Sequence, residues 1–308
     1  MSHAPISAAP ASLAKPHWIR VRLAEGEAYV ETLSRLRAHR LHTVCEEALC
    51  PNRGHCWSHG RATILILGDR CTRRCRFCNV DKREVPLPDP DEPARVAAAV
   101  QASGLREVVL TSVTRDDLPD GGAGLWAETI RRVHEASPGI LIEVLVPDFG
   151  GSESAWQQVC DAGPEVFGHN LDTVPRLYPT VRPEADYARS LRVLRFAADA
   201  GRITKTSLML GMGETREELE ATLRDARAAG VRIFYAGQYL QPTRAHLPVE
   251  RYLTPAEFEE IGALARSLGF DFVASAPLVR SSFHEDGQSA FVRQSRARPP
   301  PPPVIVGA

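Results

Sequence analysis

The chain lacks both a long apolar run and an excess of charge of either sign. Its 308 residues carry 37 Lys and Arg against 38 Asp and Glu, for a formal net charge of −1. Such a balance argues against binding to nucleic acid or anionic lipid through bulk charge. With no run of about 20 apolar residues, a membrane-spanning helix is excluded as well. We therefore expect neither nucleic acid nor a membrane as a partner.

The first 15 residues also lack the features of a targeting segment. They are rich in Ala, Ser and Pro, they have no apolar core like that of a secretory signal, and no arginine precedes Arg20, as a mitochondrial transit peptide would require. The sequence therefore predicts a cytoplasmic protein. In a reducing cytoplasm, grouped cysteines bind metal or react more often than they form disulfides.

Both ends of the chain have the composition of unstructured segments. Residues 1–17 are predicted to be disordered because they contain too few apolar side chains to join a core. Five consecutive prolines follow Arg298, and residues 293–308 are predicted to form an extended tail. A polyproline ligand for an SH3-type domain is the alternative interpretation of this tail.

Between these ends, short apolar runs alternate with amphipathic stretches. The runs predict strands over residues 63–68, 107–111, 141–146, 165–169, 204–210 and 231–239. The stretches that follow predict helices over residues 94–102, 124–136, 152–162, 187–200, 216–229 and 255–268. Six strand–helix units in succession are typical of a parallel α/β sheet.

Local signals agree with this pattern. The unbroken apolar run Ile64-Leu65-Ile66-Leu67 is what a strand covered on both faces needs. Two of the predicted helices begin with capping-box pairs, Thr215 with Glu218 and Thr254 with Glu257.

Six of the seven cysteines form two triplets. Cys45, Cys50 and Cys56 are spaced C-x4-C-x5-C, and Cys71, Cys75 and Cys78 are spaced C-x3-C-x2-C. A structural zinc site usually takes four protein ligands and a redox motif takes two. Three thiolates fit an iron–sulfur cluster in which one iron has no cysteine. A non-catalytic protein whose triplets hold zinc is the alternative.

The second triplet follows the first predicted strand, at the sheet edge where parallel α/β folds bind ligands. Polar side chains within or after the other strands are therefore predicted to bind a cofactor: Thr111, Ser112, Glu143, Asn170 and Lys205. A hydroxyl at a strand end can also serve merely to cap the next turn. Lys205 lies inside an apolar run, where a buried ammonium needs an anionic partner.

The loop of Cys71, Cys75 and Cys78, with Phe77 before its last cysteine, resembles the signature of radical S-adenosylmethionine enzymes. The resemblance implies a 4Fe–4S cluster on three cysteines, with S-adenosylmethionine chelating the fourth iron and yielding a 5′-deoxyadenosyl radical. Four arginines share the loop: Arg70, Arg73, Arg74 and Arg76. They would offset the cluster's charge, dock an acidic partner or simply lie in solvent.

A narrower resemblance extends over most of the chain. It rests on residues 15–21, 41–52 with Cys56-Trp57, 111–122, 170–178 and 237–243, and on Val279-Arg280-Ser281-Ser282-Phe283. These segments resemble the lipoyl synthase family. The resemblance implies a partial (β/α)6 TIM-type barrel over residues 63–270. It also implies extensions over residues 18–62 and 271–292 that carry an auxiliary 4Fe–4S cluster.

The same resemblance assigns ligands and an activity. Cys45, Cys50, Cys56 and Ser282 would hold the auxiliary cluster. The activity would be insertion of two sulfur atoms, taken from that cluster, at C6 and C8 of a protein-bound octanoyl-lysine to give lipoyl-lysine. The implied partners are octanoylated lipoyl domains of 2-oxoacid dehydrogenase acyltransferase components, the glycine cleavage H protein, an electron donor such as ferredoxin or flavodoxin, and an iron–sulfur carrier.

Three positions depart from the family pattern. Phe283 replaces a tyrosine, Thr206-Ser207 stands in place of Ser-Gly, and Ala276 in place of Gly. An alanine in place of glycine is strained if the backbone has a positive φ. None of these changes removes a cluster ligand. They leave open the alternative of a lipoyl-synthase-like radical enzyme that acts on a different substrate.

Overall fold

The computed structural model describes residues 13–21, 26–283 and 286–296. Its strands are β1 His42–Thr43, β2 Thr63–Ile66, β3 Glu107–Ser112, β4 Leu141–Leu145, β5 Val166–Gly168, β6 Ile203–Leu210, β7 Ile233–Gln238 and β8 Phe272–Ser275. Its α-helices are α1 Glu27–Ala38, α2 Val44–Glu47, α3 Arg53–Trp57, α4 Glu92–Ser103, α5 Ala123–Ala136, α6 Glu153–Asp161, α7 Tyr178–Val181, α8 Tyr187–Asp199, α9 Arg216–Ala228, α10 Pro255–Ser267 and α11 Asp286–Arg296. Short 3-10 turns cover Phe149–Gly151 and Pro175–Leu177.

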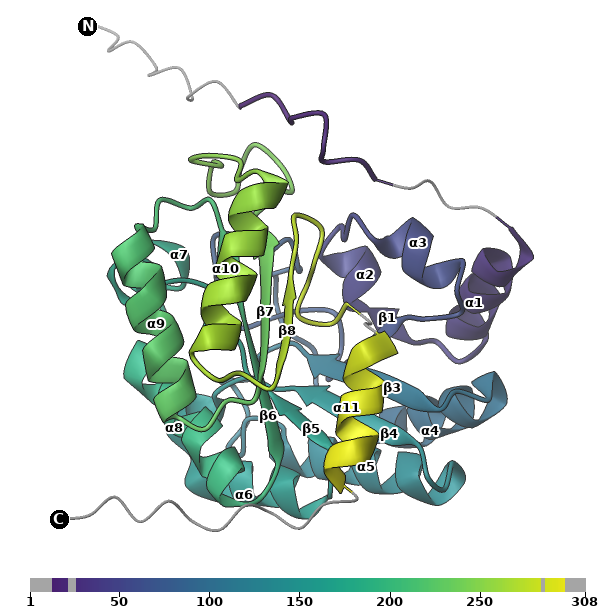
Figure 1. Ribbon diagram of the computed structural model, residues 1–308. Coiled ribbons are helices and arrows are strands. Elements are labelled where there is room, and N and C mark those ends of the chain that lie inside the picture. Colours follow the sequence, from purple (N-terminus) through teal and green to yellow (C-terminus); the bar gives the residue numbers. More distant parts are fainter. Residues whose placement is uncertain (1–12, 22–25, 284–285, 297–308) are drawn as a thin grey trace, which may run out of the picture.

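The strands form one open sheet in the order of the chain, from β1 at one edge to β8 at the other (Figure 1). β1 is antiparallel to β2. Each later strand is parallel to the one before it. The parallel α/β sheet predicted from the alternating pattern is therefore confirmed. All carboxyl ends of the parallel strands meet at one edge, where the loop of Cys71 begins.

The predicted number of parallel strands is wrong by one. The six apolar runs correspond to β2 through β7, but the sheet within the described residues adds β8 beyond them. β8 has four residues, and only Ala274 among them is buried. A short edge strand that is mostly half-buried needs no long apolar run, so the sequence signal there is weak.

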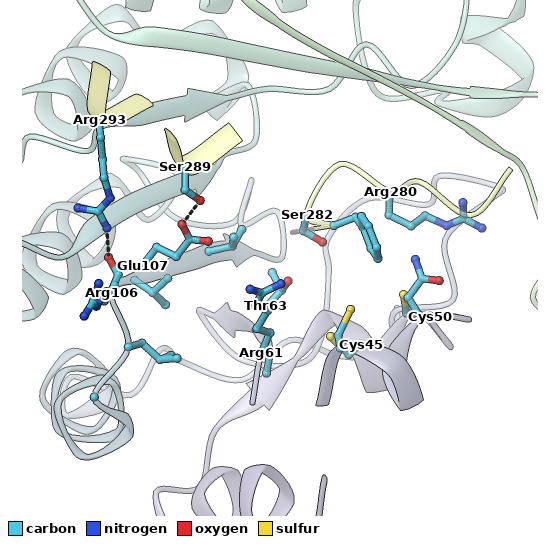
Figure 2. A pocket seen from close by; sticks show the side chains of 18 residues that line it. Cys45, Cys50, Arg61, Thr63, Arg106, Glu107, Arg280, Ser282, Ser289 and Arg293 are labelled. Carbon is cyan, nitrogen blue, oxygen red and sulfur yellow. Dashed lines mark hydrogen bonds between the residues drawn. The ribbon is translucent and has the colours of Figure 1, made fainter. Parts of the chain in front are cut away.

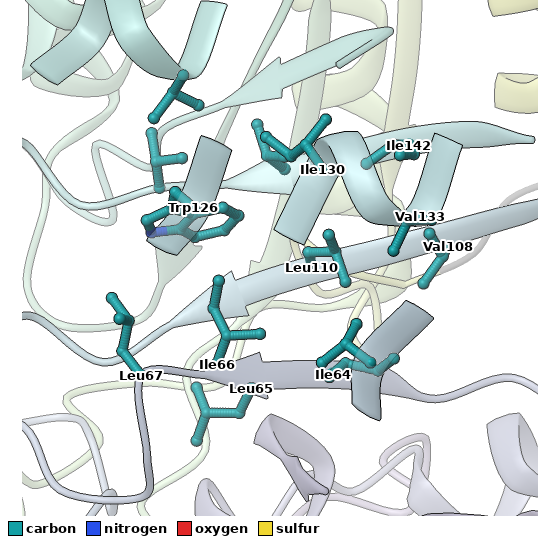
Figure 3. Packing of buried hydrophobic residues seen from close by; sticks show 14 of the residues in the cluster. Ile64, Leu65, Ile66, Leu67, Val108, Leu110, Trp126, Ile130, Val133 and Ile142 are labelled. Atoms are coloured by element: carbon teal, nitrogen blue, oxygen red, sulfur yellow. The ribbon is translucent and has the colours of Figure 1, made fainter. Parts of the chain in front are cut away.

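The apolar run at residues 64–67 is buried on both faces of the sheet, as its composition predicted. Ile64 and Ile66 point toward Trp126 of α5, and Leu65 points to the opposite side of the strand (Figure 3). All of these side chains are at most 5% exposed. Burying one such aliphatic side chain stabilises a fold by about 1.5–3 kcal/mol. Both predicted capping boxes also form, at the starts of α9 and α10.

The C-terminal helix α11 covers the amino ends of several strands. Gln288 donates a hydrogen bond to Glu143 of β4 at 2.6 Å, and Arg293 donates one to the carbonyl of Arg106 just before β3 at 3.3 Å. Arg296 pairs with Glu165, just before β5, at 3.1 Å. Residues 293–296 were expected in a disordered tail and instead belong to this helix. The remaining terminal predictions, for residues 1–12 and 297–308, lie outside the described residues.

Glu143 and Lys205 form a buried ion pair beneath α11. Lys205 Nζ lies 2.7 Å from Glu143 Oε1, 2.8 Å from Gln288 Oε1 and 3.9 Å from the centre of the Tyr235 ring. Lys205 is 2% exposed and Glu143 is 7% exposed. The predicted need of Lys205 for an anionic partner is confirmed, but that partner belongs to the protein itself.

Removing one member of this pair should be costly. We expect Lys205→Met to lower the free energy of unfolding by about 3–5 kcal/mol, because Glu143 would remain buried without its cation. The double variant Lys205→Met/Glu143→Leu should recover most of that loss, since no uncompensated charge remains. Urea unfolding of the three proteins measures both values. A single variant as stable as the parent protein would show that the pair does not support the fold.

No helix among the described residues is long and apolar enough to cross a membrane.

Candidate active site

The loop that follows β2 carries Cys71, Cys75 and Cys78 at the carboxyl edge of the sheet. Hydrogen bonds hold it on both sides: the Cys71 N–H donates to the carbonyl of Asp81 at 2.8 Å, and the N–H of Thr114 donates to the Cys71 sulfur at 3.3 Å. Lys82 donates to the Cys78 carbonyl at 2.7 Å. The predicted position of this triplet at the ligand-binding edge is confirmed.

Arg73 anchors this loop to its neighbours. The side chain is 6% exposed. Its guanidinium donates to Asp116, after β3, at 2.7 Å and to Asp148, after β4, at 2.5 Å. Burial opposes ionisation of Asp148, but the hydrogen bond and charge of Arg73 prevail and lower its pKa to about 2. Arg73 has none of the three roles considered for the loop arginines, because its side chain is buried and paired with carboxylates of the protein itself. Arg74 and Arg76 are exposed.

A cavity of about 400 Å³ opens against this triplet. Residues of or directly after strands β2 to β7 line its wall, among them Leu65, Thr111, Leu145, His169, Ser207 and Tyr235. Cys71, Cys75 and Cys78 lie on it, and so do Cys50 and Ser282 from the two ends of the chain. Segments far apart in sequence therefore meet around one space, which we call the central cavity.

The first triplet lies on two short helices beside the sheet edge. Cys45 belongs to α2, whose N-cap Thr43 accepts a hydrogen bond from the N–H of Glu46 at 3.3 Å. Cys56 belongs to α3, and Cys50 lies between them with its N–H bonded to the Cys45 carbonyl at 3.1 Å. The antiparallel pairing of β1 with β2 turns the chain back, so Cys45 lies close to Thr63 at the amino end of β2.

The C-terminal motif reaches the same place. Asn52 donates a hydrogen bond to the carbonyl of Leu278 at 2.6 Å, which ties the first triplet to the segment that holds Ser282. Cys45, Cys50, Cys56 and Ser282 line a second cavity of about 390 Å³ (Figure 2). Cys50, Arg280 and Ser282 lie on the walls of both cavities. The structure thus brings together the four predicted ligands.

All seven cysteines are free thiols. Within the part of the chain that the structure describes, no three His, Cys, Asp or Glu side chains are grouped tightly enough to hold one metal ion. Burial raises the pKa of Cys45 to about 11 and that of Cys75 to about 12. Iron binding must therefore displace thiol protons at neutral pH.

Comparison with known proteins identifies the family. Residues 65–226, just over half of the chain, match the radical SAM superfamily. A lipoyl synthase of Chlorobium limicola is 52% identical over 274 residues, which cover 88% of this chain and 94% of that protein. One of Coxiella burnetii is 52% identical over 294 residues, covering 94% and 93%. This chain belongs to the lipoyl synthase family. It is accordingly a radical SAM enzyme.

Two solved structures share the α/β fold of this chain. A crystal structure of Streptococcus suis SuiB bound to S-adenosylmethionine gives a TM-score of 0.55 at 12% identity, covering 81% of this chain and 56% of that chain. HydG from Carboxydothermus hydrogenoformans gives 0.53 at 13% identity, covering 87% and 78%. At such low identity the likeness concerns the fold alone.

The five predicted cofactor contacts divide into two groups. Thr111, Ser112 and Asn170 line the central cavity. The two hydroxyls already have protein partners, since Thr111 donates to the Leu145 carbonyl at 3.0 Å and Ser112 accepts from Trp126 at 3.1 Å. Glu143 and Lys205 are absent from the cavity wall, because they point toward the amino ends of the strands, where α11 covers them. Their prediction as cofactor contacts is not supported.

His169, which the sequence offered beside Asn170 as a candidate polar group after the fourth predicted strand, lines this wall. Sequence reasoning missed two other buried polar residues of the wall, Asp172 and Arg182. Asp172 has a positive φ of 63° and lies 3.3 Å from the Arg182 guanidinium. A partial signal was available for Asp172, since it follows Asn170 by two residues. Arg182 lies in a connecting segment and gave no such signal.

His169 is held neutral in the wall of the central cavity. Its Nδ1 lies 2.8 Å from the Val146 carbonyl and therefore carries the proton. Burial, reinforced by the charge of Arg182 and opposed by Asp148, lowers the pKa of His169 from 6.5 to about 4. Nε2 is buried and has no hydrogen-bond partner among the described residues, so its lone pair can accept from a bound ligand.

This neutral histidine should make folding sensitive to acid. The unfolded chain binds the proton near pH 6.5 and the folded chain only near 4, so the contribution is present above pH 6.5 and is lost as the pH falls toward 4. Between pH 7 and pH 5 we expect the iron-free protein to lose about 2 kcal/mol more stability than His169→Gln. Urea unfolding at the two pH values measures this. The exposed control His17→Gln should follow the parent protein, and equal losses in His169→Gln and the parent would refute the assignment.

Proposed function

We propose that this protein inserts sulfur at C6 and C8 of an octanoyl group carried on a lysine of a partner protein, giving lipoyl-lysine. The observation that supports this most directly is the central cavity. Cys71, Cys75 and Cys78 line it, and so do Cys50 and Ser282. A substrate between them would contact a radical source and a sulfur source together.

We propose that each triplet holds one 4Fe–4S cluster and that S-adenosylmethionine binds beside the second triplet. Two buried acceptors support the cofactor site, since His169 Nε2 and Asn170 Oδ1 have no partner among the described side chains and both residues line the cavity. The amino and hydroxyl groups of S-adenosylmethionine would donate to them. When bound, these groups supply a 5′-deoxyadenosyl radical for hydrogen abstraction and sulfide for insertion.

Ser282 would be the fourth ligand of the auxiliary cluster. Its residue lines both cavities beside Cys50. A serine oxygen is a hard ligand among soft thiolates and gives up its proton reluctantly. It would therefore bind more weakly than the three cysteines. A weakly bound ligand suits a site that must release sulfur toward the central cavity.

The remaining cavity wall suits a saturated chain. Apolar side chains line the same cavity as the cysteines, including Val44, Leu49, Leu65, Phe77 and Val113. They would hold the octanoyl group by burial of its methylenes, at about 0.8 kcal/mol for each, and would exclude water from a radical reaction. Because the attacked C–H bonds are unactivated, no acid–base pair is required at this site.

The division of the chain follows from the same arrangement. We propose that residues 63–270 form a partial barrel, which is supported by the shared cavity along β2 to β7. Residues 18–62 and 271–292 would close it with the auxiliary site. The proposed partners are octanoylated lipoyl domains of 2-oxoacid dehydrogenases, the glycine cleavage H protein, a ferredoxin or flavodoxin as reductant, and an iron–sulfur carrier.

A single-turnover reaction tests this function. The reduced protein, reconstituted under anaerobic conditions, is incubated with S-adenosylmethionine and an octanoyl-lysine peptide. We expect a product that has gained two sulfur atoms, together with two molecules of 5′-deoxyadenosine. Deoxyadenosine without sulfur insertion would instead favour a radical enzyme acting on another substrate. A colourless protein that holds zinc would contradict both.

A further inference from the structure

The second cavity extends away from the central cavity toward the amino ends of the strands. Its inner end holds the first cysteine triplet, and its outer end is formed by Arg106 before β3 and Arg293 of α11 (Figure 2). Arg61 and Thr63 lie between these ends (Figure 2). The cavity thus approaches the proposed auxiliary site from the side opposite to the substrate.

Most charged side chains along this passage are cationic. Among the described residues that line it, Arg61, Arg106, Arg280 and Arg293 are cationic and Glu107 is the one carboxylate. The Ser289 hydroxyl donates a hydrogen bond to that carboxylate. Arg61 lies close enough to Cys56 and Glu107 for its positive charge to favour the ionised form of each. Arg106 and Arg293 are exposed at the outer end, so an anion arriving from solvent would meet them first.

A site that gives up sulfur must regain it. The central cavity cannot easily admit a replacement, because the octanoyl chain and S-adenosylmethionine would fill it during the reaction. The second cavity reaches Cys45, Cys50 and Cys56 without passing through that space. Cationic walls in a narrow opening concentrate small anions and raise their rate of entry, by about 10-fold or more.

We propose that this second cavity is the entrance through which the auxiliary site regains sulfur, and that it takes small sulfur anions of the hydrosulfide class. Arg106 and Arg293 draw the anion to the opening. Arg61 lies along the path to the cysteines. This inference rests on the proposed function, because it requires that the first triplet hold a cluster whose sulfur is spent.

The test follows cluster assembly rather than turnover. The full chain carrying Cys71→Ala, Cys75→Ala and Cys78→Ala serves as background, since it keeps only the auxiliary triplet. Ferrous and ferric iron in equal amounts and sodium sulfide are added under anaerobic conditions, and cluster absorbance is recorded over time. The test variant adds Arg106→Glu and Arg293→Glu. The matched control adds Arg131→Glu and Arg132→Glu, which make the same charge change on the exposed face of α5.

We expect the test variant to assemble its cluster about 10-fold more slowly than the background, with a weaker dependence on salt. Its final iron content should be unchanged, which shows that the site itself is intact, and the control should match the background. Equal rates of cluster assembly in the test variant and the background would show that the second cavity is not the entrance for sulfur. That result would not contradict the proposed function. A background that assembles no cluster would instead contradict the proposed function.

A second arm separates free anions from delivery by a protein. A purified iron–sulfur carrier loaded with cluster replaces the free sulfide. Slower assembly from sulfide in the test variant supports the proposal whatever the carrier does. If the variant slows only delivery from the carrier, the arginines dock a protein surface, and the assignment of a small sulfur anion is overturned.

Discussion

Cys71→Ala is expected to abolish production of 5′-deoxyadenosine. Cys71 is one of three thiols that hold the proposed radical cluster, and its sulfur also accepts a hydrogen bond from the N–H of Thr114 at 3.3 Å. Loss of one of three thiolates leaves an iron without a protein ligand. Electron transfer to S-adenosylmethionine would then fail. Chromatography of the reaction with reduced protein measures deoxyadenosine directly, with or without the octanoyl peptide.

Cys160→Ala is the matched control for this change. Cys160 is the seventh cysteine, it lies in α6, and it is 1% exposed within the apolar core. Neither cavity is lined by it. The control should therefore produce deoxyadenosine at the parent rate. Undiminished deoxyadenosine from Cys71→Ala would refute the assignment of the radical cluster.

Cys50→Ala is expected to separate the two chemistries. It should still produce deoxyadenosine, because the second triplet is intact, but it should insert no sulfur. Bound iron should fall from about eight to about four atoms, as expected from loss of one of two four-iron clusters. Cys50 is the informative choice because it faces both cavities and so lies where sulfur would pass to the substrate. Iron assay and mass spectrometry of the peptide give the two values.

Ser281→Ala serves as the control for the second result. Ser281 precedes the proposed oxygen ligand. It lines the central cavity but not the second cavity. It should keep full iron and still form the lipoyl product. Lipoyl product from Cys50→Ala would mean that the first triplet is not the sulfur donor, even if the radical chemistry is as proposed.

The three departures from the family pattern differ in consequence. Phe283 lines the second cavity beside the first triplet and stacks on His55, with ring centres 6.1 Å apart, so a tyrosine hydroxyl is missing close to the proposed cluster. Ala276 is not among the residues with positive φ, so its methyl group brings no backbone strain. Thr206 accepts a hydrogen bond from the N–H of Leu171 at 3.1 Å, and Ser207 lines the central cavity. Phe283 and Ser207 are therefore the positions to examine for altered substrate preference.

Local patterns predicted a large part of the fold. Six of the parallel strands and the helices between them follow from apolar runs and capping signals, because both depend on residues close together in the chain. The helix α11, Asp286–Arg296, was not predicted, although its stretch is amphipathic, because it is polar overall. Its place depends on contacts with Glu143, Lys205 and Arg106, which lie more than 80 residues away.

The candidate site shows the same division. Lys205 was correctly expected to need an anion, since burial of a charge follows from its apolar neighbours. Whether that anion was a cofactor or Glu143 depended on which strand ends the two side chains approach. The sheet register pairs Lys205 with Ile233, the first residue of β7, and Glu143 with Val166, the first residue of β5, which places both near the amino ends of those strands, away from the cysteine loop.

By itself, the sequence determined the chemistry available to this protein: two groups of three thiols at short spacing, one of them directly after a buried strand. Only the tertiary structure decided that the second group shares a cavity with Cys50 of the first group and with Ser282 from the far end of the chain, and that a second, arginine-lined cavity reaches the first group from the amino ends of the strands. The reason is that spacing along the chain fixes which donors lie within a few residues. The antiparallel β1, the hydrogen bond from Asn52 to Leu278 and the docking of α11 bring distant segments together.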